Sequence, residues 1–335
     1  FVDKVIALSM FIDKEFHPYF QQNPIKLVDI GASGGLQNNW RKAKKFLDIL
    51  AFEPDEREYK RLIRKSSPNI SYHNIALYNK ETVLDFHLTR KQEVSSSFYP
   101  NTAFLSKFPD AERFDVLETI KLNTDTLDNR IKKEAIDNVD FIKLDAQGNT
   151  LSILEGASNT LKGVFGLEVE VEFTSIYKKQ PLFSDVDVFA RKHGFQLFDI
   201  KKYFWKRESG KKCGMSKGQI IFADALYLKD SHVFIKGLET CPDNLLMKSK
   251  ILNAISISIL YGYIDYAAEI FELRKDCFTR KEIELFSLFL KKNIPLSEYI
   301  PKFKGRNRFA GIFRMLHKFI KQDAWAECDE YLGNL

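Results

Sequence analysis

The alternation of short apolar strands with helical segments between residues 25 and 229 limits the fold of this chain more than any other feature. Most strand-like runs are followed by a segment of helical periodicity, up to a helix expected over residues 183–193. Because strand–helix–strand units give parallel strand pairs, this order predicts a mostly parallel sheet with helices on both faces. The last two runs, 195–200 and 219–228, have no helix between them and predict a terminal antiparallel hairpin. We therefore expect an α/β fold, a Rossmann-like sandwich around a seven-stranded sheet.

The same pattern divides the chain into three expected parts. Residues 1–24 have apolar residues at helical spacing and predict an N-terminal helix that ends before Pro24. Residues 25–229 form the sheet domain. Residues 230–335 show helical periodicity without a convincing strand, so we expect a separate all-α C-terminal domain whose role no motif indicates.

Composition places the chain among ordinary globular proteins. Hydrophobic residues make up 44% and charged residues 29% of the sequence. No apolar run approaches the roughly 18–20 residues that span a bilayer. The N-terminus mixes Asp3 and Lys4 with apolar residues, which does not suit a secretory signal. The four cysteines lie far apart, which argues against a disulfide framework or a zinc site, so we expect a cytoplasmic location.

A glycine-rich turn at the end of the first predicted strand, within LVDIGASGG, is the strongest local signal for a ligand. Glycines allow a tight turn and a close approach of the backbone to a ligand. The spacing is D-x-G-x-x-x-G, not the G-x-G-x-x-G of dinucleotide sites, and an acid at the strand end would repel a pyrophosphate. An acid at this position suits S-adenosylmethionine, which carries an amino group and a positively charged sulfonium. The alternative is a turn that only folds. The residues expected at this cofactor are Asp29, Gly31, Ala32, Ser33 and Gly35.

Two later positions extend the expected cofactor site. Glu53, followed by Pro54, ends the second strand about 20 residues beyond the glycines, the usual place for an acid that binds both ribose hydroxyls. A helix N-cap is the alternative role for an acid here, and Asp55 suits it better. Asn74 and Ala76 lie in the third strand, expected over residues 70–77, and are expected near the adenine edge.

The residues Asp145-Ala146-Gln147-Gly148 follow a strand expected over 139–145. Open α/β sheets bind ligands at the carboxyl ends of their strands, so Asp145 and Gln147 are expected at the cofactor. Asp145 has three open roles: it holds the amino group of the methionine part, acts as a general base, or caps the turn.

Three glutamates alternate along the next strand, Glu168, Glu170 and Glu172, and so share one face of it. A central parallel strand is normally apolar on both faces, so these acids either line a polar cavity or pair with basic residues such as Lys143. Crowding raises the pKa of a carboxyl group, which suits a general base. The candidate catalytic residues are therefore Asp145, Glu170 and Glu172.

Over roughly residues 25–229 the sequence resembles the FkbM family of methyltransferases. The matching stretches are VDIGASGG (28–35), AFEPD (51–55), VDFIKLDAQGNTLSILEGA (139–157) and LEVEVEFTSIYKKQPLF (167–183), with weaker likeness in SSSFYPN, HGFQLFDI and GQIIFADALYLK. The resemblance implies a class I methyltransferase fold, S-adenosylmethionine as cofactor, and O-methylation of a hydroxyl on a sugar, glycan or secondary metabolite. One departure is visible: the family usually has Gly-Ala-Glu after the glutamine, where this chain has Gly148-Asn149-Thr150.

Two basic clusters, residues 201–217 and 302–314, bear on the partners. They are either solvated loops or a surface for a phosphorylated acceptor, such as a nucleotide sugar, a lipid-linked glycan at the inner membrane face, or nucleic acid. A nucleic-acid methyltransferase is one alternative, but the DAQG turn is not the Asp/Asn-Pro-Pro-aromatic turn of base-amine methylation. An inactive interaction protein with this fold is the other. No group of oxygen ligands predicts a metal, and nothing indicates an oligomeric state.

Overall fold

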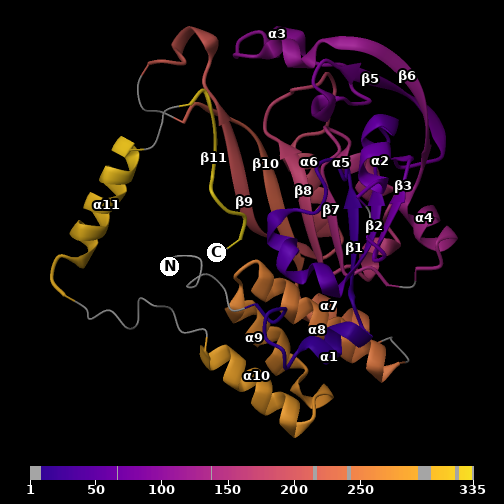
Figure 1. The fold of residues 1–335 in the computed structure, drawn as a ribbon, viewed down its shortest axis with the longest axis vertical. Coiled ribbons are helices and arrows are strands. Elements are labelled where there is room, and N and C mark those ends of the chain that lie inside the picture. Colours follow the sequence, from indigo (N-terminus) through magenta and orange to yellow (C-terminus); the bar gives the residue numbers. More distant parts are fainter. Residues whose placement is uncertain are drawn as a thin grey trace.

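A computed structural model describes the chain apart from residues 1–8, 66, 137, 214–216, 240–242, 293–302, 321–323 and 334–335. Its centre is an eight-stranded sheet in the spatial order β11-β9-β10-β8-β7-β1-β2-β3 (Figure 1). The strands in that order are β11 (Ala326–Cys328), β9 (Phe195–Trp205), β10 (Gln219–Lys229), β8 (Gly166–Glu172), β7 (Phe141–Leu144), β1 (Ile25–Ile30), β2 (Leu47–Phe52) and β3 (Ile70–His73). From β8 to β3 all pairs are parallel, whereas β10 is antiparallel to both β8 and β9. The predicted parallel sheet with a terminal antiparallel hairpin is confirmed, but it has eight strands where seven were expected, because β11 adds to its edge.

A second, three-stranded sheet has the order β4-β6-β5. Its strands are β4 (Ala76–Leu77), β6 (Val116–Asp125) and β5 (Thr82–Thr89). The single strand expected over residues 70–77 is wrong, because the chain pairs with β2 up to His73 and then crosses to pair with β6 from Ala76. This crossing places the small sheet beyond the carboxyl ends of β1 and β2 (Figure 1).

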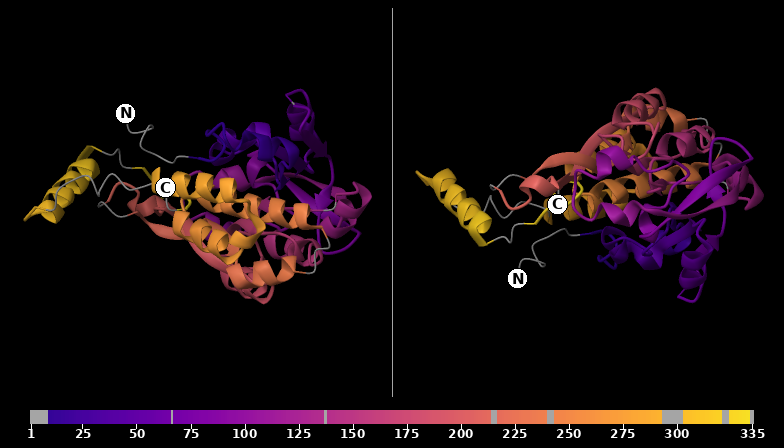
Figure 2. Two further views of the ribbon diagram at one scale, coloured as in Figure 1. Left: turned by 90° about the horizontal axis from the view of Figure 1, so that it is seen from below. Right: turned by 90° about the horizontal axis from the view of Figure 1, so that it is seen from above.

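Helices cover both faces of the large sheet (Figures 1 and 2). On one face, with apolar side chains of β1 and β7, pack α4 (Leu127–Lys133), α5 (Thr150–Glu155) and α6 (Phe183–Lys192). On the other face pack α1 (His17–Gln22), η2 (Asn38–Phe46), α2 (Glu56–Ile63), α7 (Ser231–Leu238), α8 (Asn244–Leu260), α9 (Ile264–Leu273) and α10 (Arg280–Lys292). The remaining helices are η3 (Gln92–Val94), α3 (Thr102–Leu105), η4 (Ala111–Phe114), η5 (Thr160–Lys162), η6 (Glu208–Gly210), η7 (Lys275–Cys277) and α11 (Arg306–Ile320).

The C-terminal third differs from the sequence expectation in one element. Ala326–Cys328 forms β11 on the outer edge of β9, so the expectation that residues after 230 are entirely helical is wrong. Three residues are too few to show a strand period, and the pairing with β9 creates this strand. At the other end, the described part of the expected N-terminal helix is helical only over His17–Gln22, and residues 1–8 lie outside the described part.

Helix α8 is buried from Ser249 to Leu260 and shares one apolar core with β1, β2, α9 and α10. A buried ion pair ties it to the sheet: Lys250 Nζ lies 2.8 Å from Asp140 Oδ1 and also donates to the carbonyl of Val139 at 3.0 Å. Asn253 Nδ2 and the backbone N–H of Lys26 donate to the other carboxylate oxygen of Asp140 at 3.0 Å and 2.9 Å. The packing between the sheet and the C-terminal helices is therefore continuous.

We expect Lys250→Met to lower the free energy of unfolding by about 3–5 kcal/mol, because it leaves the buried Asp140 carboxylate without its cation. The control is Lys60→Met, which removes an exposed pair with Glu56 and should change stability by less than about 1 kcal/mol. Urea unfolding measures both variants. Equal stability of the two would show that the buried pair does not anchor α8.

Candidate active site

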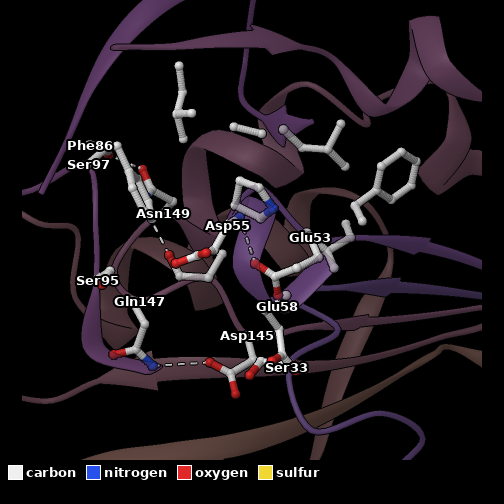
Figure 3. Close-up of a pocket in the computed structure, with 18 of the residues that line it drawn as sticks. Ser33, Glu53, Asp55, Glu58, Phe86, Ser95, Ser97, Asp145, Gln147 and Asn149 are labelled. Carbon is white, nitrogen blue, oxygen red and sulfur yellow. Dashed lines mark hydrogen bonds between the residues drawn. The ribbon is translucent and has the colours of Figure 1, made fainter. Parts of the chain in front are cut away.

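A cavity of about 200 Å³ opens where the carboxyl ends of β1, β2 and β7 meet the small sheet. Six expected cofactor residues beside Asp145 line it: Gly31, Ser33, Glu53, Pro54, Ala76 and Gln147. Figure 3 shows Glu53, Asp55 and Glu58 gathered on one side of the cavity, with Asp145 and Gln147 joined below them. The tertiary structure thus brings together the polar groups that follow three separate strands.

The turn after β1 requires glycine at its first position. Gly31 has a φ of 74°, and a Cβ there would lie 1.8 Å from the carbonyl oxygen of Asp145. The two strand ends also share a backbone hydrogen bond of 2.9 Å, from Asp145 N–H to Ile30 O. Any side chain at position 31 would therefore push β1 and β7 apart. Gly35 also has a positive φ, of 77°, but has open space around it and does not line the cavity.

Asp29 lies beneath the turn instead of in the cavity lining. Its Oδ1 is 3.3 Å from Lys143 Nζ, which also donates to the carbonyl of Gly31 at 3.0 Å. Burial raises the pKa of Asp29, and the Lys143 charge opposes that rise. Ala32 is buried in the apolar core on the same side. Asp29 and Ala32 therefore support the turn, and their contact with a cofactor stays a prediction.

Glu53 ends β2 with its side chain only 6% exposed, and its carboxylate accepts the backbone N–H of Asp55 at 2.9 Å. Burial raises the pKa of Glu53 to about 7. Asp55 accepts the N–H of Arg57 and is the N-cap of α2, as predicted. Asn74 does not line the cavity: its Nδ2 donates to the backbone carbonyls of Glu53 and Pro54 at 2.8 Å and 3.1 Å and so fixes the position of Glu53.

The cavity also has an apolar wall that the sequence pattern did not predict. Five side chains form it, from the end of β3 and the small sheet: Ile75, Leu77, Leu84, Phe86 and Leu122. Such a wall suits a flat, apolar ring. The available signal was the alternation in β5, where Leu84 and Phe86 share one face and Asp85 and His87 the other. That pattern does not say which surface the apolar face covers.

Gln147 joins two of the candidate catalytic carboxylates. Its Nε2 donates to Asp145 Oδ1 at 3.1 Å and to Glu170 Oε1 at 2.9 Å, while Tyr177 Oη lies 2.9 Å from its Oε1. Its backbone has a φ of 45°, a left-handed conformation that costs energy outside glycine. Ser96 Oγ donates to its carbonyl at 2.6 Å. The surrounding contacts therefore hold a strained residue at one orientation.

The two positions that depart from the family pattern have clear roles. Asn149 lines the cavity and accepts the hydroxyl of Ser97 at 2.7 Å. Thr150 stands where the family usually has glutamate, and its hydroxyl donates to the backbone carbonyl of Glu170 at 2.7 Å. Thr150 therefore ties α5 to β8 without adding a further acid.

The three glutamates of β8 are all buried, but none lines the cavity. Glu168 accepts the hydroxyl of Tyr261 at 2.6 Å, and Glu170 reaches the cavity only through Gln147. Burial raises the pKa of Glu168 to about 7 and that of Glu172 to about 8. Burial and the charges of Asp145 and Glu172 raise the pKa of Glu170 as well. The predicted rise for Glu170 and Glu172 is found, while their part in catalysis stays a prediction.

The order of the sheet is that of a class I methyltransferase fold, and the Gly31 turn and Glu53 line the cavity at the carboxyl ends of its strands. The sequence matches the profile of the Methyltransferase FkbM domain over residues 29–197, half of the chain. The chain belongs to this family and is an S-adenosylmethionine-dependent methyltransferase.

Other comparisons are weaker. No curated protein matches the sequence significantly. Magnesium protoporphyrin IX methyltransferase from Synechocystis, solved with bound S-adenosylmethionine, is 9% identical over 64% of this chain and 76% of its own, with a TM-score of 0.33. The N-terminal domain of EvdMO1, solved with S-adenosylhomocysteine and D-fucose, is 6% identical over 65% and 81%, with a TM-score of 0.32. Precorrin-6y C5,15-methyltransferase from Geobacter metallireducens is 10% identical over 68% and 95%, with a TM-score of 0.31. Similarity at this level says nothing of the acceptor.

We expect the chain without ligand to become less stable as the pH rises from about 5.5 to about 8.5. A carboxyl whose pKa is higher in the folded state binds protons more tightly there, so its stabilisation is present at low pH and lost as pH rises through the folded pKa. Glu168, with a pKa of about 7, contributes to this loss. Glu168→Gln keeps an acceptor for Tyr261 and should reduce the loss by about 1–3 kcal/mol. Urea unfolding at the two pH values gives the free energy of unfolding of both proteins. The same change in this free energy for the wild type and for Glu168→Gln would contradict the prediction.

We expect affinity for S-adenosylhomocysteine to rise as the pH rises through about 7, because only ionised Glu53 accepts two ribose hydroxyls fully. Glu53→Gln should bind at least about tenfold more weakly and lose this pH dependence. Glu56→Gln, at an exposed acid on α2 outside the cavity lining, is the control and should bind like the wild type. Titration calorimetry between pH 6 and pH 9 gives these affinities. Unchanged binding by Glu53→Gln would remove Glu53 from the ribose site.

Proposed function

We propose that this methyltransferase methylates a hydroxyl group on a sugar, a glycan or a similarly hydroxylated small molecule. The observation that carries the proposal is the Asp145 carboxylate in the cavity wall, joined through Gln147 to the buried Glu170. An alcohol needs a base that takes its proton while its oxygen forms the new bond to carbon. A carboxylate held in place at the mouth of the sheet supplies that base.

The cavity fits the cofactor on two observations. First, the backbone of Asp145 comes so close to Gly31 that a Cβ at position 31 has no room. Second, the buried Glu53 carboxylate accepts the N–H of Asp55 with one oxygen and has its other oxygen free to accept hydroxyls. We assign Gly31 and Ser33 to the methionine part and Glu53 to the ribose, and keep Asp145 for the acceptor hydroxyl. Phe86, with the rest of the apolar wall, is assigned to the adenine. When bound, S-adenosylmethionine supplies a methyl group from its sulfonium, and the sulfur keeps the electron pair of the broken bond.

The roles of the chain's own residues follow from their contacts. Asp145 accepts the proton of the acceptor hydroxyl. Gln147 fixes the orientation of the Asp145 carboxylate, because its two amide hydrogens bond Asp145 and Glu170 together. Glu170 is a positioning residue that acts through Gln147. Glu172, with a pKa raised to about 8 by burial, keeps the surroundings of Asp145 from gaining a further full negative charge near neutral pH.

The nucleic-acid alternative receives less support from the structure. In the basic cluster 201–217, Lys202 and Lys217 both pair with Asp329, and Lys211 pairs with Glu208. Charges neutralised within the protein add little to the binding of phosphates. We therefore place the acceptor among small molecules and glycans, including phosphorylated or lipid-linked ones.

Asp145→Asn should lower kcat by at least about a hundredfold while affinity for S-adenosylhomocysteine changes less than about tenfold. Methyl transfer from a labelled donor to sugars, nucleotide sugars and RNA measures the first quantity, and calorimetry the second. A large loss of affinity for S-adenosylhomocysteine with little change in kcat would assign Asp145 to the amino group of the cofactor and contradict its role as base. Transfer of label to RNA alone would overturn the proposed acceptor class.

A further inference from the structure

Helix α11 exposes a large apolar surface. Six side chains on it and just before it are 49–69% exposed: Phe303, Phe309, Ile312, Phe313, Met315 and Leu316. Residues 309, 312, 313 and 316 have the spacing that places side chains on one face of a helix. Figures 1 and 2 show α11 standing apart from the sheet and from the helices that cover it. This apolar face therefore has no cover within the described part of the chain.

The same segment carries positive charge without acid. Residues 302–322 contain seven Lys and Arg residues and no Asp or Glu. Lys304 and Arg308 are exposed, and no acidic side chain among the described residues pairs with either. In the other basic cluster, 201–217, three of the seven basic residues pair with an acid: Lys202 and Lys217 with Asp329, and Lys211 with Glu208. Lys304 and Arg308 are by contrast free to attract an anionic surface.

This combination of properties favours a membrane surface over another protein copy. Two copies of an acid-free basic helix repel each other when their apolar faces meet. An anionic bilayer instead offers negative headgroups to the basic residues and hydrocarbon just below them to the phenylalanines. With 15 residues, α11 is shorter than the roughly 20 that cross a bilayer, and no described helix is both long and apolar enough to do so.

We propose that α11 and the residues just before it bind the surface of an anionic lipid bilayer, with the helix lying in the headgroup plane and Phe309, Ile312 and Phe313 toward the hydrocarbon. The inference stands on α11 alone and does not depend on which hydroxyl the enzyme methylates. It brings the methyltransferase domain to the place where a lipid-linked acceptor would lie.

Vesicle flotation with the full chain tests the proposal. We expect binding to vesicles of phosphatidylcholine with about 30% phosphatidylglycerol, and binding at least about tenfold weaker to phosphatidylcholine alone. About 1 M salt should weaken the binding, because it screens charges within a few ångströms. Phe313→Asp should bind the anionic vesicles at least about tenfold more weakly. Leu245→Asp introduces the same negative charge at an exposed apolar residue of α8, which is 78% exposed and lies outside α11. This variant should bind like the wild type.

Two further measurements keep the outcomes distinct. Affinity for S-adenosylhomocysteine should be the same in Phe313→Asp and the wild type, which shows that the variant is folded and separates this test from that of the proposed acceptor. Light scattering gives the oligomeric state. Failure to bind anionic vesicles, or a wild-type dimer that Phe313→Asp converts to a monomer without any vesicle binding, would overturn the proposal.

Discussion

The close contact between the ends of β1 and β7 is the constraint on which the site depends. Gly31 meets the carbonyl oxygen of Asp145 at a distance that leaves no room for a Cβ. This contact fixes the glycine turn against the turn that carries Asp145 and Gln147. Both turns therefore line the same cavity, and the proposed base Asp145 lies beside the proposed cofactor site. Lys143 reinforces the contact from below by binding Asp29 and the carbonyl of Gly31 together.

The second organising feature is the excess of carboxyl groups around this contact. Glu53 and Asp145 follow β2 and β7, Glu170 lies near the carboxyl end of β8, and burial raises the pKa of Glu53 and Glu170. Holding several acids in a poorly solvated place costs stability, since each would be better hydrated in the unfolded chain. A cationic ligand compensates part of that cost when it binds. The same electrostatic arrangement that weakens the free protein therefore favours a positively charged cofactor.

The fold separates a rigid body from one exposed element. Lys250 and Asn253 hold α8 on the buried carboxylate of Asp140, so the C-terminal helices and the sheet share one core. Helix α11 lies outside that core with the apolar residues Phe309, Ile312 and Phe313 exposed. The proposed catalysis and the proposed attachment to a membrane surface thus belong to different parts of the chain, because the residues that line the cavity all lie outside α11.

Local sequence patterns predict the parallel sheet, its final hairpin, the glycine turn and the acid at the end of β2. Each of these depends on a local rule, either a period of hydrophobicity or the backbone freedom of Gly31. Three features could not be predicted in this way: the run expected over 70–77 divides between two sheets, Phe86 lines the cavity, and Asp29 lies beneath the turn. These outcomes depend on which distant segment each backbone pairs with and which side chain each surface meets, and a local pattern contains neither piece of information.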